Sequence, residues 1–193
     1  TRHLLELVND VLDMSKLEAG RLDIKEEPFD LTELMNEVAA LMDSQVMQTG
    51  LVHRKHRGTI RHTALYGSSL QLRRIMLNLM SNSVKYNKPN GTIDTYATEI
   101  SDDGETALYE FRIVDSGIGM SREFIENELF KPFTQEENDA RTQYRGTGLG
   151  MSIVKALIDR LGGTIKVEST LGEGTDITYQ LLFKIDKNAS EQS

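Results

Sequence analysis

Residues 106–119 read TALYEFRIVDSGIG, an alternating strand that runs directly into a glycine-rich turn. Apolar side chains recur at every second position from Ala107 to Ile113, which is the period of a strand with one buried face. The carboxylate of Asp115 at the strand end can accept a hydrogen bond from an amine, and the glycines after it let a ligand approach the backbone. An ordinary tight turn explains the same residues, so this motif alone is a weak signal.

Outward from this strand, the hydrophobic pattern switches between extended and helical periods. A strand at 92–100 precedes it across the turn at 102–104, which reads Asp-Asp-Gly. Helices are expected at 4–19, 30–42, 69–86 and 149–161, and further strands at 51–57, 59–66, 164–168 and 175–183. We therefore expect an α+β fold: a two-layer α/β sandwich with a mixed, mostly antiparallel sheet, helices on one face and an added N-terminal helix.

Composition narrows the class of protein. The 193 residues are 38% hydrophobic and 27% charged, as in a globular protein with a core. The chain has no cysteine, so disulfides, thiolate catalysis and cysteine-bound zinc are excluded. A formal net charge of -8 argues against non-specific binding to nucleic acid. No apolar run is long enough for a transmembrane helix, and the first residues do not resemble a signal peptide.

The first expected helix carries an unusually wide apolar band between Leu4 and Met14, and Gly20 is placed to end it. Such a band predicts contact with a surface outside this chain, or else with the chain's own domain. The expected organisation is a helix and linker at 1–27, a main domain at 28–186 and a disordered tail at 187–193.

The helix at 69–86 carries polar side chains on one face. Asn78, Asn82 and Lys85 are spaced four and three residues apart, which aligns them on a helix of 3.6 residues per turn. A neighbouring apolar face can be buried. Two amides and an ammonium group can bind a ligand, although for this motif alone a plain solvated face is the favoured explanation.

A second glycine motif, Gly-Thr-Gly-Leu-Gly at 146–150, stands where a loop enters a helix. The N–H groups and the dipole at a helix N-terminus favour anions. The motif is not a Walker P-loop, because no Gly-Lys-Ser/Thr follows, and the turn at 115–119 is not a Rossmann motif, because Arg122 occupies the third glycine position. The alternative interpretation of this motif is a helix start whose glycines merely allow close packing. Lys85, Arg141 and Arg145 are candidate cations that could offset phosphate charge.

These three motifs stand in a fixed order, each on the expected element, and as a set they resemble the sensor histidine kinases. Residues 77–86 resemble the N box of that family, 115–119 the G1 box, 129–133 the F box, 146–150 the G2 box and 172–175 the late glycine turn. Residues 9–20 resemble the end of the second dimerisation helix. The resemblance covers roughly residues 3–185.

The resemblance implies a Bergerat-type ATP-binding fold with ATP as substrate and Mg²⁺ as cofactor. Asp115 would accept a hydrogen bond from the adenine amino group, and Asn82 would ligate Mg²⁺ with help from Asn78. The other implied roles are packing on adenine by Tyr86, shaping of its pocket by Gly117 and Gly119, phosphate contact by Lys85, a phosphate-binding loop of Gly146, Thr147, Gly148, Leu149 and Gly150, and anchoring of a nucleotide-responsive lid by Phe130 and Phe133.

Two departures from the family pattern matter. Both Arg141 and Arg145 are candidates for the γ-phosphate contact, and the sequence does not choose between them. The phosphoacceptor box, a histidine followed by an acidic residue, is absent: His3 is followed by two leucines, and the other three histidines lie in the strand region at 51–66.

The function expected from the resemblance is the catalytic domain of a two-component kinase, transferring the ATP γ-phosphoryl group to a histidine on a dimerisation domain. The implied partners are that dimerisation domain and a response regulator receiver domain. The parent protein is expected to be a cytoplasmic homodimer with a membrane anchor. The alternatives are an ATPase of the wider superfamily, whose water-activating glutamate is replaced here by Asn78, and a non-catalytic nucleotide-binding module.

Overall fold

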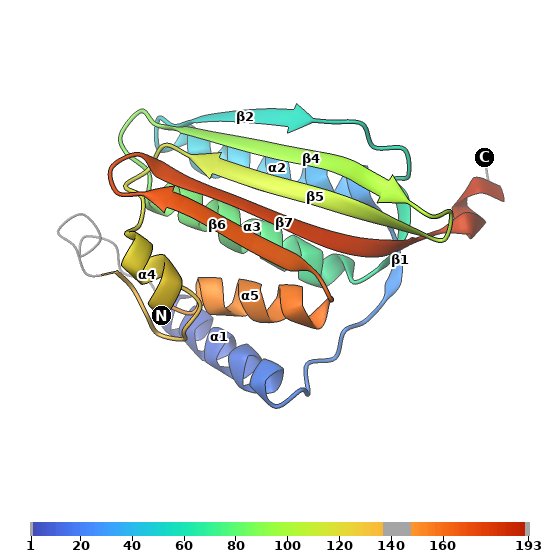
Figure 1. Cartoon of the computed structure of the whole chain (residues 1–193), viewed down its shortest axis with the longest axis horizontal. Helices are drawn as coiled ribbons and strands as arrows, with labels where there is room; N and C mark the ends of the chain where they lie inside the picture. Colours follow the sequence, from blue (N-terminus) through green and yellow to red (C-terminus); the bar gives the residue numbers. More distant parts are fainter. Residues whose placement is uncertain (1, 137–147, 192–193) are drawn as a thin grey trace.

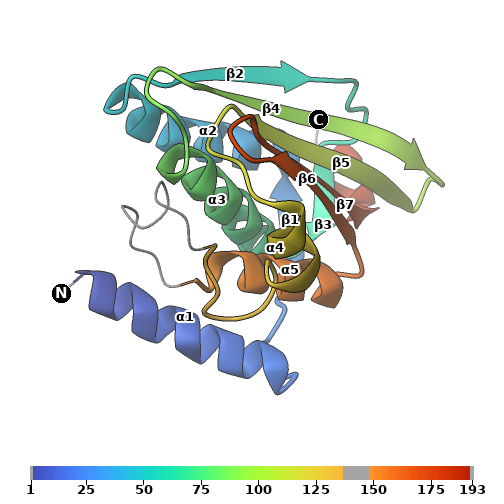
Figure 2. The same ribbon diagram turned by 60° about the vertical axis from the view of Figure 1, so that its left-hand side comes forward.

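The computed structural model describes residues 2–136 and 148–191. Their strands form one sheet, and helices α2, α3 and α5 cover one of its faces, with α1 beyond α5 (Figures 1 and 2). The predicted α+β sandwich is confirmed. The elements, in chain order, are α1 (Arg2–Glu18), β1 (Glu27–Asp30), α2 (Leu31–Met47), β2 (Val52–Arg57), β3 (Ala64–Gly67), α3 (Ser69–Lys85), β4 (Thr92–Asp102), β5 (Thr106–Asp115), α4 (Arg122–Asn127), α5 (Gly150–Arg160), β6 (Thr164–Thr170), β7 (Gly174–Ile185) and the 3-10 helix η1 (Lys187–Glu191).

The sheet is mixed and mostly antiparallel, as predicted. Within the described residues its seven strands run in the order β1-β3-β7-β5-β4-β2, and β6 also pairs with β7. Only the pair of β2 and β4 is parallel among these. Asp115 pairs with Ile93 on one side and with Thr175 on the other. The C-terminal end of the central strand β5 therefore lies beside the beginnings of β4 and β7, at one end of the sheet's central strands.

The core fixes the orientation of α3. Leu72, Ile75 and Leu79 on this helix are at most 1% exposed, and Leu157 of α5 is fully buried with them. Because these side chains occupy one face, the face with the asparagines is turned away from the core and remains partly exposed. Asp30 caps α2, accepting a 2.9 Å hydrogen bond from the N–H of Glu33 as its sequence position predicts.

Some elements differ from the sequence-based expectation. Strand β1 was not predicted, because Pro28 reads as a break; proline is tolerated there since β1 is an edge strand. The expected strand at 59–66 is wrong in its first half, since only Ala64–Gly67 is extended. Helix α4 was not predicted either, although Ser121 caps it. A 3-10 helix occupies Lys187–Glu191, in the segment expected to be disordered.

Helix α1 packs part of its apolar band on its own domain and leaves the rest exposed. Leu7 and Met14 pack against the core beside α5, as does Leu17. Leu4 and Leu5, in contrast, are more than 60% exposed, and three further apolar residues of α1 are exposed with them: Val8, Val11 and Leu12. In the part of the chain that the structure describes, no helix is both long and apolar enough to span a membrane.

A buried carboxylate explains why residues 59–63 leave the sheet. The side chain of Glu99 is 0% exposed, and it accepts hydrogen bonds from the N–H of His62 at 2.9 Å, from Arg61 Nε at 3.1 Å and from the hydroxyl of Tyr109 at 3.1 Å. Arg61 also pairs with Asp102 at 3.2 Å. Burial raises the pKa of Glu99, but the hydrogen bonds from His62, Arg61 and Tyr109 outweigh it and hold the pKa below its ordinary value.

We predict that Glu99→Gln destabilises the fold by roughly 1–3 kcal/mol at neutral pH, because buried donors lose a charged acceptor. A carboxylate with a lowered pKa stabilises the folded state above its unfolded pKa, 4.5, and loses that effect as the pH falls through the folded value. The difference between the two proteins should therefore shrink below pH 4.5. Urea unfolding at pH 7, 5 and 4 measures it; a difference that grows on acidification would contradict this assignment.

Candidate functional site

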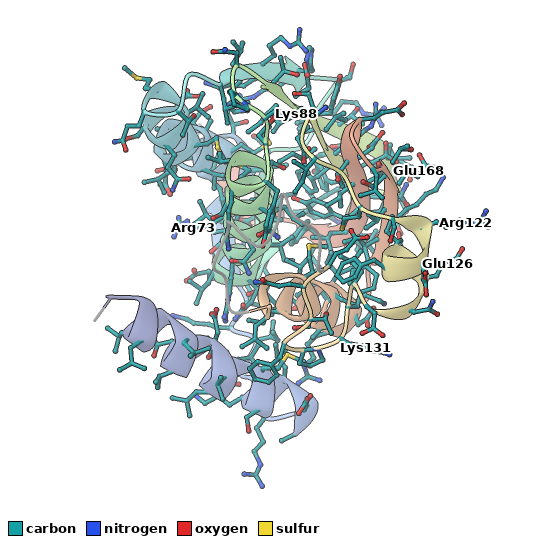
Figure 3. The ribbon with its side chains drawn as sticks, turned by 90° about the vertical axis from the view of Figure 1, so that its left-hand side faces the viewer. Arg73, Lys88, Arg122, Glu126, Lys131 and Glu168 are labelled. Atoms are coloured by element: carbon teal, nitrogen blue, oxygen red, sulfur yellow. The ribbon has the colours of Figure 1, made fainter. Side chains whose placement is uncertain are left out.

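The candidate residues gather at the end of the sheet where the central strand β5 ends. The C-terminal end of α3, the turn after β5 and the N-terminal end of α5 meet there, while α4 lies beside them (Figure 1). In Figure 3 Lys88 is labelled beyond the end of α3, and Arg122 and Glu126 project outward from α4 as an exposed ion pair with a separation of 2.8 Å. The end of α3 and the beginning of α5, more than 60 residues apart along the chain, therefore lie close together at this end of the sheet.

Tyr86 and the turn after β5 are joined through the backbone. The N–H of Ile118 donates to the carbonyl of Tyr86 at 3.0 Å, and the N–H of Gly117 donates to Asp115 Oδ1 at 2.9 Å. A Cβ atom on Gly117 would lie 2.4 Å from the carbonyl oxygen of Tyr86 and 2.7 Å from Asp115 Oδ1. Glycine is thus required at position 117, because Tyr86 and Asp115 approach from both sides.

The turn between β6 and β7 holds the other side of the same loop. The N–H of Gly172 donates to the carbonyl of Ile118 at 2.8 Å, and the ammonium group of Lys88 donates to the carbonyl of Gly172. Gly119 has φ +68°, and a Cβ there would lie 2.0 Å from the carbonyl oxygen of Thr170. The late glycine turn therefore supports the loop that carries Asp115.

Asn82 lies against the beginning of α5. A Cβ atom on Gly150 would be 3.7 Å from Asn82 Nδ2 and 3.9 Å from Asn82 Oδ1. Leu149, the N-cap residue of α5, is fully buried, so its contribution to a site is limited to its backbone. The first N–H groups of a helix have no partner within that helix, and the helix dipole adds positive potential. The Asn82 side chain and the N-terminal end of α5 are therefore neighbours.

Lys85 and Asn78 complete the polar face of α3. The ammonium group of Lys85 lies 5.1 Å from the centre of the Tyr86 ring, within the range of a cation–π contact. Asn78 is partly exposed one turn before Asn82. Side-chain amide oxygens are hard ligands of the kind Mg²⁺ accepts alongside phosphate oxygens and water. The donor set thus fits a magnesium-bound polyphosphate.

The predicted F box forms a separate small cluster. Phe130 is partly buried against Met120, Phe124 and Leu129. Phe133 behaves differently: it is 63% exposed and has φ +63°. A Cβ atom on Gly148, which has φ +72°, would lie 2.8–3.0 Å from the backbone of Phe133 and Thr134. The F box and Gly148 of the second glycine motif are therefore in contact.

Four of the predicted site residues, Arg141, Arg145, Gly146 and Thr147, lie outside the described residues. Among the described candidates, Tyr86 with Lys85 beside its ring meets the loop of Asp115, Gly117 and Gly119, Asn82 faces Gly150 with Asn78 one turn away, and Phe130 belongs to the separate F-box cluster. Sequence reasoning missed Asn87 and Ser116, whose side chains link these segments. Both stand next to predicted residues, and adjacency was the only signal available.

An apolar cavity of about 70 Å³ lies elsewhere, between helices α2 and α3 and the sheet. Its walls include Met35, Met80 and Phe111. It lacks the carboxylate, the amides and the helix end described above, and we regard it as a packing gap of the core rather than as the chemical site.

We predict opposite outcomes for the same substitution in the two glycine motifs. Gly119→Ala should destabilise the fold by about 1–3 kcal/mol, because it adds both backbone strain and a clash with Thr170. Gly150→Ala has room and lies in the first turn of α5, where alanine is the better helix former, so stability should be kept or raised. Urea unfolding compares them; equal losses in both variants would contradict the described packing.

Comparison with known proteins identifies the family of the chain. Residues 67–185 match the family model described as "Histidine kinase-, DNA gyrase B-, and HSP90-like ATPase". The chain is 36% identical over 193 residues to the sensor protein GacS of Pseudomonas syringae pv. syringae, covering 99% of this chain and 21% of the relative. It is 36% identical over 183 residues to the circadian input-output histidine kinase CikA of Synechococcus elongatus, covering 91% and 23%. The chain thus spans about a fifth of the length of these relatives.

Solved structures show the same fold. Full-length ShkA in complex with AMPPNP has a TM-score of 0.78 and 29% identity, covering 95% of this chain and 36% of that chain. The Acinetobacter baumannii histidine kinase AdeS has a TM-score of 0.69 at 23% identity, covering 95% and 79%. The chain therefore belongs to the family of histidine kinase-, DNA gyrase B- and HSP90-like ATPases, as a catalytic domain of the sensor histidine kinase type.

Proposed function

We propose that this domain binds Mg-ATP at the end of the sheet where β5 ends, with the adenine at Asp115 and Tyr86 and the phosphates at the beginning of α5. The observation that carries the proposal is the placement of two groups at the C-terminal end of α3: the Tyr86 carbonyl accepts from the loop of Asp115, and the side chain of Asn82 faces Gly150 at the beginning of α5. Asn82 in the last turn of α3 and Tyr86, the C-cap residue of that helix, are four positions apart, which is about 6 Å along a helix axis. A nucleotide has the same order of groups, a base at one end and charged phosphates at the other.

Each described group has a distinct task in this arrangement. The carboxylate of Asp115, whose Oδ1 accepts from the N–H of Gly117, is the proposed acceptor for the adenine amine. Asn82, with Asn78 one turn before it, offers amide oxygens to Mg²⁺, and Lys85 offers positive charge to phosphate. When bound, Mg²⁺ would neutralise phosphate charge, which is the main requirement of phosphoryl transfer. The candidates for the γ-phosphate contact remain Arg141 and Arg145.

The acceptor of the phosphoryl group is proposed to be a histidine of a dimerisation domain. The position one turn before Asn82, where a water-activating base would stand in an ATPase, holds the amide Asn78, which cannot take a proton. This favours transfer to a protein side chain over steady hydrolysis. By analogy with full-length sensor kinases, we propose a homodimeric, membrane-anchored parent with a cytoplasmic catalytic domain and a response regulator receiver domain as downstream partner.

Binding is tested by two substitutions in the two halves of the site. In Asp115→Asn the amide oxygen would keep the Gly117 bond and the amide nitrogen would face the adenine amine, so a donor would meet a donor. We expect calorimetric ATP affinity to fall at least about 100-fold, to the limit of detection. Asn82→Ala should instead remove the dependence of affinity on Mg²⁺. Unchanged affinity in folded Asp115→Asn would show that the base lies elsewhere.

Transfer is tested with the domain and its acceptor. The chain is mixed with a separately prepared dimerisation domain of the same kinase and with γ-labelled ATP. We expect acid-labile, base-stable label on the dimerisation domain, as a phosphohistidine requires, and none when its acceptor histidine is changed to glutamine. Steady phosphate release by the isolated chain, without label on the partner, would favour an ATPase instead.

A further inference from the structure

Three backbone segments at the site are tied together by two side chains that the proposed nucleotide contacts do not use. We refer to them as the Asn87–Ser116 bridge. Asn87 follows Tyr86 at the end of α3, and Ser116 follows Asp115 at the end of β5. Each bridge residue is thus the immediate neighbour of a residue assigned to the base. Asn87 is only 6% exposed, which is unusual for an asparagine at the end of a helix.

The bridge is hydrogen-bonded within itself and to the start of β4. The hydroxyl of Ser116 donates to Asn87 Oδ1 at 3.2 Å and accepts from the N–H of Thr92 at 2.8 Å. Asn87 Nδ2 donates to the carbonyl of Thr92 at 3.1 Å, and its Oδ1 also accepts from the N–H of Lys88 at 2.9 Å. The backbone N–H of Ser116 donates to the same Thr92 carbonyl at 3.1 Å. Thr92 therefore serves as the common anchor of both side chains.

The packing around the bridge leaves no space for adjustment. A Cβ atom on Gly91 would lie 2.2 Å from Asn87 Oδ1 and 2.7 Å from Ser116 Oγ. The carbonyl of Gly91 accepts a hydrogen bond from the N–H of Val52, and this bond holds Gly91 against the first residue of the edge strand β2. On the other side, a Cβ on Gly117 would lie 3.2 Å from the Cα of Asn87. Glycine on both flanks brings backbone against the bridge, so a shift of either bridge residue is transmitted to its neighbours.

We propose that Asn87 and Ser116 are positioning residues that set selectivity for the 6-amino group of adenine, acting through Asp115 and Tyr86. The inference rests on the proposed function, because it takes Asp115 as the group that reads the base. A hydrogen bond weakens steeply with misalignment, so base recognition depends on where the Asp115 carboxylate is held relative to the Tyr86 ring. The bridge fixes both, since it joins the residue after each of them to Thr92.

This placement makes a prediction that a purely structural role does not. If the bridge only stabilised the fold, its loss would lower the affinity for every nucleotide triphosphate alike, or leave affinity unchanged at temperatures where the protein is folded. If it aligns Asp115, its loss should weaken ATP while sparing purine riboside triphosphate, which has the same phosphates and lacks the amine. The measured quantity is therefore the ratio of the two affinities.

The test uses Ser116→Ala in the whole chain, with calorimetric affinities for ATP and purine riboside triphosphate at saturating Mg²⁺. We expect ATP affinity to fall about three- to tenfold, the effect of one hydrogen bond, and the affinity for purine riboside triphosphate to change less than about twofold. Ser69→Ala is the matched control. It removes one side-chain hydrogen bond, to Glu27 at 2.9 Å, at the opposite end of α3, and should leave the ratio unchanged.

Two further variants keep the outcome interpretable. Gly91→Ala pushes the bridge apart without removing any of its groups, so it should lower the same ratio, and it serves if Ser116→Ala does not fold. Asp115→Asn reports on the proposed function itself. If Asp115→Asn abolishes the preference for ATP while Ser116→Ala and Gly91→Ala keep it, the bridge inference is overturned and the base assignment stands. If Asp115→Asn keeps the preference, the base assignment fails as well.

Discussion

The burial of one face of α3 is the constraint on which the site depends. Leu72, Ile75 and Leu79 are withdrawn from water beneath the sheet, and at roughly 25 cal/mol per Å² of apolar surface this burial outweighs any preference of the polar residues. The helix has no rotational freedom once that face is fixed. Asn82 is then directed to the beginning of α5 and Tyr86 to the end of β5, so the two ends of the site are set by the core rather than by each other.

Glycines complete what the core begins, at points where backbone meets backbone. At position 117 the Tyr86 carbonyl and the Asp115 carboxylate leave no space for a methyl group, and at position 119 the strand end at Thr170 does the same. These positions explain why the motif can be recognised in a sequence at all. Where two chain segments approach this closely, only glycine fits. A glycine in the sequence therefore marks such a point even when the two segments are far apart along the chain.

Elements set by local pattern could be predicted from the sequence, and those set by distant partners could not. The alternation from Ala107 to Ile113 predicted strand β5 and its buried face. The spacing of the asparagines predicted that they share one face of α3. The family resemblance added roles that neither pattern contains. Strand β1 was missed because its pairing with β3 offsets the presence of Pro28. The extended run at 59–63 was overpredicted because the carboxylate that diverts it, Glu99, lies far along the chain. The Asn87–Ser116 bridge was missed because it depends on the pairing of strand ends: its anchor Thr92 begins β4, and Ser116 follows the end of β5, 24 residues along the chain.

The buried N-cap of α5 has a consequence for the thermodynamics of binding. Leu149 is held in the core, and its carbonyl accepts from the hydroxyl of Ser152 at 2.8 Å and from the N–H of Ile153 at 2.9 Å. The first turn of this helix is therefore ordered before any anion arrives. An anion that meets a preorganised helix end loses little affinity to the ordering of that end. The ordering of this turn therefore adds little to the entropic cost of binding, which consists of the lost freedom of the ligand and the ordering of other groups.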